Sequence, residues 1–532
     1  MLKTTYLAIL AALVLGKPTF ATYCDGGHDP VTPTPITPSL PPSDGDGGNS
    51  TTKCFPSGFM FGTATSAFQV EGGVNATGRT PSFWDAMCKS GSGLQCANVA
   101  DDFVHRYKSD IQLLKADGYG AFRLSISWTR AMTWNNATGH MEANPEGLAY
   151  YHSVIDELLA NRIEPVVTVF HWDVPLALYQ LGDFLQASII DHFVEYSDLV
   201  YREFGQKVKR WATINEPLSY MAILYTRSAS DSDEYEAAHN LILAHAASVQ
   251  RFRELQAGGT VLKDAQIGLV VDSFGIPMNA SDPADVEAAE RYNQFEVGWW
   301  MSPLATGDYP AVMRERVGSR LPTFTEQQAA VVKGSYDLLM FNFYGSSLIT
   351  DCASASSQTN CSTLSAGHHA DMGVDSSQFP PEAVRASGST CSSRFGYAPS
   401  YLTAIEWLHK QDPNTGILLT ENGWCGNATI DNQDQVWYYR THLQQVHKAI
   451  HEEKIPIVGY LAWSFLDNYE WGQYDARYGL YHVDFPVNIG SPDLYTVPET
   501  SLTRTPRSAA KFMRTVATTG CVEVKPEDTK WL

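Results

Sequence analysis

The stretch RWATINEP at residues 210–217 joins an apolar, strand-like run to Asn215, Glu216 and Pro217. A second stretch, ILLTENG at residues 417–423, has the same form and places Glu421 directly after its apolar run. In a parallel barrel the carboxyl ends of the strands meet on one face, so glutamates from distant parts of the chain can lie together there. Cleavage of a glycosidic bond requires two carboxyl groups, one to protonate the leaving oxygen and one to attack the sugar or activate water. The two stretches therefore predict a parallel sheet and a sugar-cleaving site.

Short apolar runs alternate with longer helical patterns between residues 54 and 521. This alternation is typical of βα units, which build a parallel sheet. Eight such runs predict an α/β fold, a single (β/α)8 TIM barrel, with insertions in the βα loops at 353–393 and 484–504. An open, doubly wound sheet is the alternative. The expected strands are 59–65, 121–127, 164–170, 210–214, 266–271, 338–343, 417–420 and 457–463, and the expected helices include 102–116, 147–161, 189–204, 237–256 and 436–454.

Size and charge limit the classes of function. The chain has 532 residues, of which 44% are hydrophobic, and this is enough for one large domain or two ordinary ones. The formal net charge of −21 argues against a nucleic-acid partner, because phosphate binding needs a basic face.

The two ends of the chain differ in composition from its middle. Residues 1–21 contain a basic start, an apolar run and a small-residue cleavage site, which is the pattern of a signal peptide. Residues 22–53 are rich in Pro, Thr, Ser and Gly and predict a disordered tail. We expect the catalytic domain at 54–521, a C-terminal tail at 522–532, no membrane anchor and a secreted protein. Six N-x-S/T sequons fit passage through a secretory pathway: Asn49, Asn75, Asn136, Asn279, Asn360 and Asn427.

Nine cysteines allow several disulfides, and their odd number leaves at least one unpaired. Cys88 and Cys96 are close enough for a local bridge, and Cys54 and Cys521 stand at the two ends of the domain. The spacings do not resemble those of a structural zinc site. Further pairings are open among Cys352, Cys361 and Cys391.

Polar or aromatic side chains follow six of the eight expected strands, where the active site of a parallel barrel lies. A carboxylic acid with a raised pKa can protonate the glycosidic oxygen, and an ionised carboxylate can attack the anomeric carbon. Amides, imidazole and carboxylates can bind sugar hydroxyls, and indoles offer flat apolar faces to a sugar ring. Spacing alone does not tell which glutamate is the acid. The candidates are Gln69, His171, Asn215, Glu216, Asn342, Tyr344, Glu421, Trp463, Glu470 and Trp471.

Eight ordered motifs resemble glycoside hydrolase family 1, the retaining β-glucosidase family, and the resemblance covers nearly the whole expected domain. The motifs are FMFGTATSAFQVEGG at 59–73, RLSISW at 123–128, FHWDVP at 170–175, TINEP at 213–217, AAHNLILAHA at 237–246, FNFYGS at 341–346, TENG at 420–423 and GYLAWSFLDNYEW at 459–471.

The resemblance implies a role for each candidate. Glu216 would be the general acid/base and Glu421 the nucleophile, while Arg123 and Tyr344 would hold Glu421 ionised and oriented. Asn215 would bind the 2-hydroxyl of the sugar. No metal or organic cofactor is implied, and the expected partners are small β-glucosides or oligosaccharides. Asn342 would support the site, and the rest of the non-reducing sugar would be bound by Gln69, His171, Trp463, Glu470 and Trp471.

Some features leave alternatives open. Plant myrosinases of the family carry Gln where this chain has Glu216, so we expect an O-glycosidase. Residues 218–240 form a shorter connection than is usual after TINEP, which leaves the aglycone preference open. Cys425 is either a free thiol or a disulfide partner. A transglycosidase that uses the same residues and a catalytically silent glycan-binding relative are the alternative functions.

Overall fold

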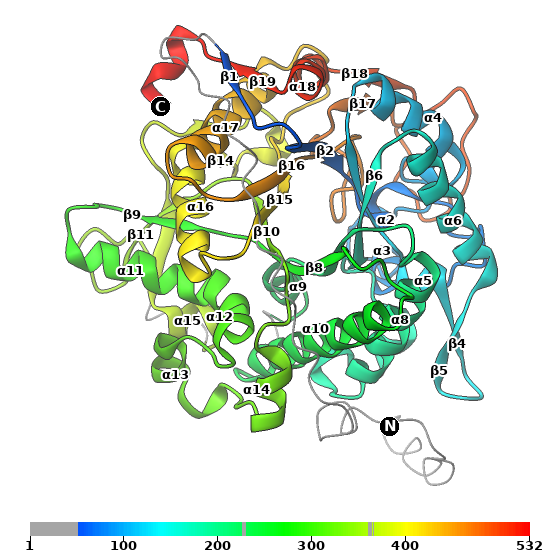
Figure 1. Cartoon of the computed structure of the whole chain (residues 1–532), viewed down its shortest axis with the longest axis horizontal. Coiled ribbons are helices and arrows are strands. Elements are labelled where there is room, and N and C mark those ends of the chain that lie inside the picture. The colour runs from blue at the N-terminus through cyan, green and yellow to red at the C-terminus, as the bar shows by residue number, and fades with distance from the viewer. Residues whose placement is uncertain (1–51, 226–229, 360–363, 365, 532) are drawn as a thin grey trace.

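Eight parallel strands close into a barrel at the centre of the protein (Figure 1). The structure, a computed structural model, describes residues 52–225, 230–359, 364 and 366–531. The barrel order, in which the last strand also pairs with the first, is β2 (Met60–Ala64), β3 (Ala121–Ser125), β6 (Glu164–Phe170), β7 (Arg210–Asn215), β8 (Gln266–Val271), β10 (Leu339–Phe343), β15 (Ile417–Asn422) and β16 (Ile457–Trp463). The predicted (β/α)8 barrel is confirmed.

The barrel interior is filled by side chains from the strands themselves. Ala121, Val166, Ala212 and Val270 belong to an apolar cluster separate from the rest of the core, and all four are fully buried. Successive strand residues point to opposite faces, so their neighbours in sequence face the surrounding helices. The interior is therefore a packed core, and the space for a ligand lies at the strand ends.

Helices surround the barrel. Helix α8 shows why the sequence forms them: Phe193, Val200 and Phe204 recur on one buried face, and the helix stops before Gly205. The longer helices are α4 (Phe103–Ala116), α6 (Pro145–Ala160), α8 (Ile189–Phe204), α10 (Asp233–Ala257), α11 (Pro283–Asn293), α16 (Pro399–Gln411), α17 (Gln433–His451) and α18 (Ser508–Thr519). The shorter ones are α2 (Ala67–Val70), α3 (Phe83–Lys89), α5 (Trp128–Ala131), α7 (Leu176–Gln180), α9 (Pro217–Leu224), α12 (Trp299–Thr306), α13 (Ala311–Val317), α14 (Glu326–Val332) and α15 (His368–Met372).

The expected strand at 417–420 extends to Asn422 in the structure. The parallel ladder with β10 continues to this point, pairing Asn342 with Glu421 and Phe343 with Asn422 across a register shift. Glu421 is therefore fixed by backbone pairing, and does not lie in a loop beyond the strand.

The insertion expected at 353–393 contains regular structure of its own. A small sheet outside the barrel combines β9 (Gly275–Pro277), β11 (Ser347–Asp351) and β12 (Val374–Gln378), and Figure 1 shows β9 and β11 beside α11. Strand β13 (Val384–Arg385), farther along the insertion, pairs with β14 (Phe395–Gly396), which lies just beyond its end. The second insertion, 484–504, is irregular up to the short strand β18 (Arg504–Pro506), which pairs with β17 (Tyr481–Val483).

The described ends of the chain are tied together. Strand β1 (Thr52–Cys54) pairs antiparallel with β19 (Cys521–Glu523), and a disulfide joins Cys54 to Cys521. Asp528, in the last turn of 3-10 helix, is buried and accepts hydrogen bonds from Arg440 of α17 at 2.8 and 2.9 Å. Strand β19 and Asp528 thus attach the expected C-terminal tail to β1 and α17. The signal peptide and the Pro-rich tail expected at 1–53 lie almost entirely outside the described residues.

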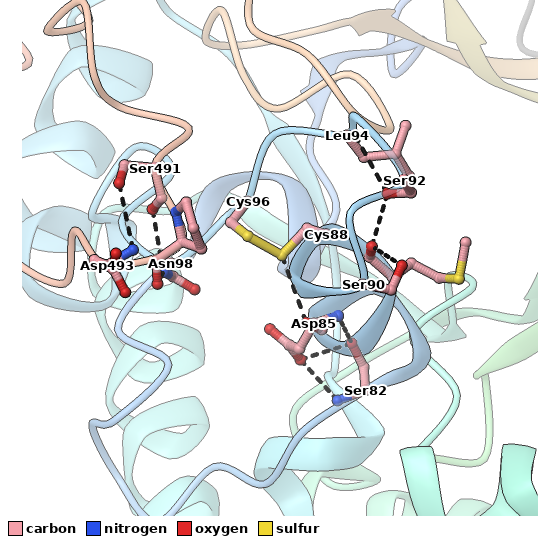
Figure 2. Close-up of a disulfide and its surroundings, with 12 residues drawn as sticks. Ser82, Asp85, Cys88, Ser90, Ser92, Leu94, Cys96, Asn98, Ser491 and Asp493 are labelled. Carbon is pink, nitrogen blue, oxygen red and sulfur yellow. Dashed lines mark hydrogen bonds between the residues drawn. A yellow bond between two sulfur atoms is a disulfide. The ribbon is translucent and has the colours of Figure 1, made fainter.

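The predicted Cys88–Cys96 bridge is present and closes a loop that supports a neighbouring loop (Figure 2). Next to it, the Gln95 amide donates to the Gly472 carbonyl at 2.9 Å, and the Tyr474 amide donates back to the Gln95 side chain at 3.0 Å. Asn98 donates to the Pro492 carbonyl at 2.9 Å. The disulfide loop thus holds both the segment after Trp471 and the second insertion.

Cys391 pairs with Cys425. Cys425 is therefore a disulfide partner and not a free thiol, and of the three cysteines whose pairing was left open, Cys391 bonds outside the group. The partner of Cys391 could not be found from spacing, because it lies beyond the whole of α16 and β15 in the chain. Cys24 and Cys361 lie outside the described residues. Among the described helices, none is long and apolar enough to cross a membrane.

Candidate active site

A cavity of about 140 Å³ lies at the carboxyl ends of the barrel strands. Eight of the residues predicted from the sequence line it, and the remaining three, Arg123, Asn215 and Asn342, are fully buried and hydrogen-bond to its carboxyl groups or to one another. The lining consists of Gln69, His171, Trp172, Glu216, Ser219, Asp272, Tyr344, Arg394, Glu421, Trp463, Glu470, Trp471 and Tyr478.

Glu421 lies between two groups that stabilise its ionised form. The Arg123 guanidinium donates to one carboxylate oxygen, and the Tyr344 hydroxyl donates to the other at 2.6 Å. Arg123 is itself held in place by Thr168, whose hydroxyl accepts from Nε at 3.0 Å. Because Glu421 is 2% exposed, little water screens this ion pair.

Two asparagines link Glu421 to Glu216. Asn215 accepts a hydrogen bond from Arg123 at 2.6 Å, and its amide nitrogen lies 3.3 Å from Nε2 of His171. Asn342 donates to the carboxyl of Glu216 at 2.7 Å, while Thr420 donates to the Asn342 carbonyl at 2.6 Å. Arg123 can only donate, which fixes the orientation of the Asn215 amide, and the Asn215 oxygen can only accept, which fixes the Asn342 amide that donates to it at 3.2 Å.

Glu216 is the single residue between β7 and α9. Its backbone has φ of 41°, in the left-handed region that a residue with a side chain adopts at a cost, and Pro217 follows at the first helical position. Its amide still donates to the Val270 carbonyl at 2.9 Å. The strand-to-helix turn thus places the carboxyl at the strand end without losing the backbone hydrogen bond.

The two glutamates differ in what surrounds them. Burial raises the pKa of Glu216 well above its usual range, and the carboxylates of Asp272 and Glu421 raise it further. Burial also raises the pKa of Glu421, but Arg123 and Tyr344 oppose that effect. A single proton shared by this pair is therefore held on Glu216, while Glu421 stays ionised.

The polar groups around the pair are arranged for uncharged hydroxyls. Burial and the charge of Arg123 lower the pKa of His171 well below its usual value, so the imidazole is neutral. Burial raises the pKa of Glu470 to about 8, against hydrogen bonds from Trp463 and Asn468. Nδ1 of His171 and one oxygen of Glu470 have no partner among the described residues, and buried polar atoms of this kind normally have one.

Gln69 is positioned by the protein on both sides of its amide. Its nitrogen donates to Asn468 and to the Tyr469 carbonyl, each at 3.0 Å, and Ser66 donates to its oxygen at 2.6 Å. The oxygen retains a second lone pair, so Gln69 meets a ligand as a fixed acceptor.

Aromatic rings form one side of the cavity. The Trp471 ring centroid lies 4.5 Å from that of Trp172 and 4.9 Å from that of Trp84. The His171 ring is nearly parallel to the rings of Trp463 and Trp471, with 6.0 Å between centroids in each case. Trp172 and Trp471 have positive φ, like Glu216, and strained backbone of this kind is common at functional sites.

Sequence reasoning did not identify Asp272, Arg394 and Tyr478. Asp272 directly follows β8, so the rule that found the other strand-end residues applies to it as well. Its carboxyl accepts from Ser219 at 2.8 Å, and burial raises its pKa to about 6. Arg394 directly follows the first insertion and hydrogen-bonds Tyr478, and no strand pattern points to either.

The comparisons with known proteins agree with this geometry. The model of the family described as glycosyl hydrolase family 1 matches residues 51–521. β-Glucosidase 26, peroxisomal, of Arabidopsis thaliana is 36% identical over 470 residues, which cover 81% of each chain.

Solved structures are similar over most of their length. Rice Os3BGlu6 β-glucosidase, solved as a mutant in a covalent complex with Glc, superposes with a TM-score of 0.77 at 32% identity, covering 86% of this chain and 98% of the rice chain. Aphid myrosinase also gives a TM-score of 0.77, at 30% identity, covering 88% of this chain and 99% of its own.

Proposed function

This chain belongs to glycosyl hydrolase family 1, and we propose that Glu216 and Glu421 are the acid/base and the nucleophile of its retaining β-glucosidase reaction. One observation carries the assignment: Arg123 and Tyr344 both donate to Glu421, whereas Glu216 is buried beside the carboxyl group of Asp272. A nucleophile must be ionised and a general acid must carry its proton, and these surroundings favour that distribution.

In the first step, a carboxylate oxygen of Glu421 attacks the anomeric carbon as the bond to the glycosidic oxygen breaks. Glu216 gives its proton to that oxygen, so the aglycone leaves as a neutral alcohol. The product is a glycosyl-enzyme, in which the sugar is joined through its anomeric carbon to Glu421. The rice relative was solved in a covalent complex with Glc, which supports an intermediate of this kind.

In the second step, the ionised Glu216 takes a proton from water as the water oxygen attacks the same carbon. The bond to Glu421 breaks, and both carboxyl groups return to their starting protonation states. Two inversions at one carbon give net retention. Asn215, held by Arg123 at 2.6 Å, is placed to bind the 2-hydroxyl during both steps.

The aglycone is assigned to an adjoining cavity of about 250 Å³, which shares Asp272, Tyr344 and Arg394 with the first. Its lining includes Phe379 and Phe395, whose rings stack with 3.9 Å between centroids. Aromatic walls favour flat apolar groups, so small aryl β-glucosides are the substrate class proposed.

The test is proton NMR of an aryl β-glucoside during hydrolysis by the purified protein. We expect β-glucose to appear first and α-glucose to follow only by mutarotation. Initial α-glucose would overturn the double displacement. Adding methanol distinguishes a transglycosidase, for which methyl β-glucoside, and not glucose, would be the main product.

The similarity to an aphid myrosinase raises thioglucosides as a second substrate class. A thioglucoside aglycone needs little protonation, whereas the buried, proton-bearing Glu216 is suited to an oxygen leaving group. We therefore expect kcat/KM to be higher for an O-glucoside than for the thioglucoside with the same aglycone. A higher kcat/KM for the thioglucoside would show instead that thioglucosides are the preferred substrates.

We also propose that the protein is exported. Three disulfides join described cysteines, and such bonds persist mainly in oxidising compartments. All four sequon asparagines in the described part of the chain are exposed: Asn75, Asn136, Asn279 and Asn427. Expression of the full chain in eukaryotic cells, followed by removal of N-glycans from the medium fraction, should shift its mass; protein confined to the cell without glycans would contradict export.

A further inference from the structure

Two histidines and a glutamate meet on the outside of the barrel, away from the catalytic cavity. The hairpin of β4 (Met132–Asn135) and β5 (His140–Ala143) packs against α8, as Figure 1 shows. His140 begins β5, and His192 and Glu195 lie one turn apart on α8. Positions three apart on a helix share a face, so all three side chains point to one place.

The possible ligand atoms of the three side chains already lie almost as close to one another as ligands of a single ion do. One ligand atom from each lies within 4.8 Å of the other two. Nδ1 of His140 is 3.3 Å from Oε2 of Glu195, and Nδ1 of His192 is 3.9 Å from the same oxygen. In a tetrahedral zinc site with metal–ligand bonds of ~2.0–2.1 Å, ligand atoms are ~3.3 Å apart. Small side-chain rotations therefore complete the arrangement.

The ligand types and their exposure fit a transition metal better than calcium or magnesium. Imidazole is a preferred ligand of Zn²⁺, whereas the two hard cations take oxygen almost exclusively. The side chains of His140 and Glu195 are 41% and 28% exposed, so an ion can enter and keep a water as its fourth ligand. The edge of the Trp134 ring packs against His192, with 5.9 Å between centroids, and limits the movement of that imidazole.

We propose that His140, His192 and Glu195 form a binding site for Zn²⁺ or a similar first-row divalent ion, which fastens the β4–β5 hairpin to α8. Two of the ligands come from the helix and one from the hairpin, so the ion joins the two elements in addition to the contact of His140 with Glu195. None of the three lines the catalytic cavity, and the site is structural in role.

The test is isothermal titration of ZnCl₂ into the untagged full-length protein after removal of metal with a chelator. We expect one saturable equivalent, and a Kd at least ~10-fold weaker in each of His140→Ala, His192→Ala and Glu195→Gln. Co²⁺ gives a second readout, because coordination by two imidazoles produces visible absorption that each substitution should remove. Hydrogen exchange at 132–143 should slow on addition of Zn²⁺.

His152→Ala is the matched control. His152, on α6, also pairs with a glutamate of α8: its Nε2 lies 2.8 Å from Glu203. Its other ring nitrogen lies 3.3 Å from the Lys207 ammonium, which cannot bind a metal ion. This variant should bind Zn²⁺ like the unaltered protein. Absence of saturable binding below millimolar Zn²⁺, or unchanged affinity and Co²⁺ absorption in the His140 and His192 variants, would overturn the proposal.

Discussion

The active site has a floor built by strands and a wall built by loops. The floor consists of Arg123, Asn215, Glu216, Asn342 and Glu421, which lie on β3, β7, β10 and β15 or directly after them. The wall consists of Gln69, Arg394, Glu470, Trp471 and Tyr478, which come from short helices and loops.

The two parts are held in place by different interactions. Floor residues are aligned by the parallel ladder, as in the pairing of Asn342 with Glu421. The wall depends on contacts between loops, such as the hydrogen bond from Gln95 to Gly472 beside the Cys88–Cys96 bridge. We infer that changes in the floor reduce kcat by large factors, while changes in the wall raise KM by small ones.

The largest effect is expected for Glu421→Gln. The substitution keeps the shape of the side chain but removes the charge that attacks the sugar, so kcat should fall more than ~10³-fold for every β-glucoside. Steady-state rates with an aryl β-glucoside measure this. Glu236→Gln, at an exposed position in the first turn of α10, is the control and should leave kcat unchanged. More than a few per cent of residual activity in this variant would show that Glu421 is not the nucleophile.

Glu216→Gln should separate substrates by their leaving groups. For an alkyl β-glucoside, which needs protonation, we expect a loss of ~10²–10⁴-fold in kcat/KM. For a dinitrophenyl glucoside, whose aglycone leaves without a proton, the first step should be nearly unaffected. The comparison is made over a series of aryl glucosides of rising aglycone pKa. Equal losses across the series would mean that Glu216 only positions the substrate.

Asp272→Asn should change the pH profile more than the maximal rate. Burial is the main cause of the raised pKa of Glu216, and the Asp272 charge adds to it. Without that charge the ionised form of Glu216 is less unfavourable, so the pKa of Glu216 falls. As pH rises, Glu216 then loses its proton at a lower pH than in the unaltered protein. We expect the alkaline limb of kcat/KM to move down by ~1 pH unit.

Ser219→Ala sharpens this prediction. The Ser219 hydroxyl donates to Asp272 at 2.8 Å and lowers its pKa, so its removal keeps Asp272 protonated to higher pH. Between pH 5 and 7 the neutral Asp272 no longer raises the pKa of Glu216. We therefore expect the alkaline limb of kcat/KM to move in the same direction, but by less. An unshifted limb in both variants would show that Asp272 does not act on the acid.

The floor could be predicted from sequence, and most of the wall could not. Glu216 and Glu421 each follow an apolar run that forms a strand, and barrel topology then brings them to one face. Asp272 obeys the same rule and could have been found by it. Arg394 directly follows an insertion, and it meets Tyr478 through packing between segments that are distant in the chain. Such contacts leave no periodic pattern in the sequence.

The smallest effect on catalysis is expected from Cys88→Ser/Cys96→Ser. The bridge closes a short loop, and its loss should lower the free energy of unfolding by about 2–3 kcal/mol. Because the loop also contacts the backbone around Gly472, the adjoining Trp471 should be held less firmly, and KM should rise ~2–10-fold with kcat little changed. The control is Cys54→Ser/Cys521→Ser, which opens a bridge spanning 467 residues and should cost more stability without changing KM. A rise in KM in the control as large as in the Cys88 variant would mean that stability, and not support of the wall, sets the affinity.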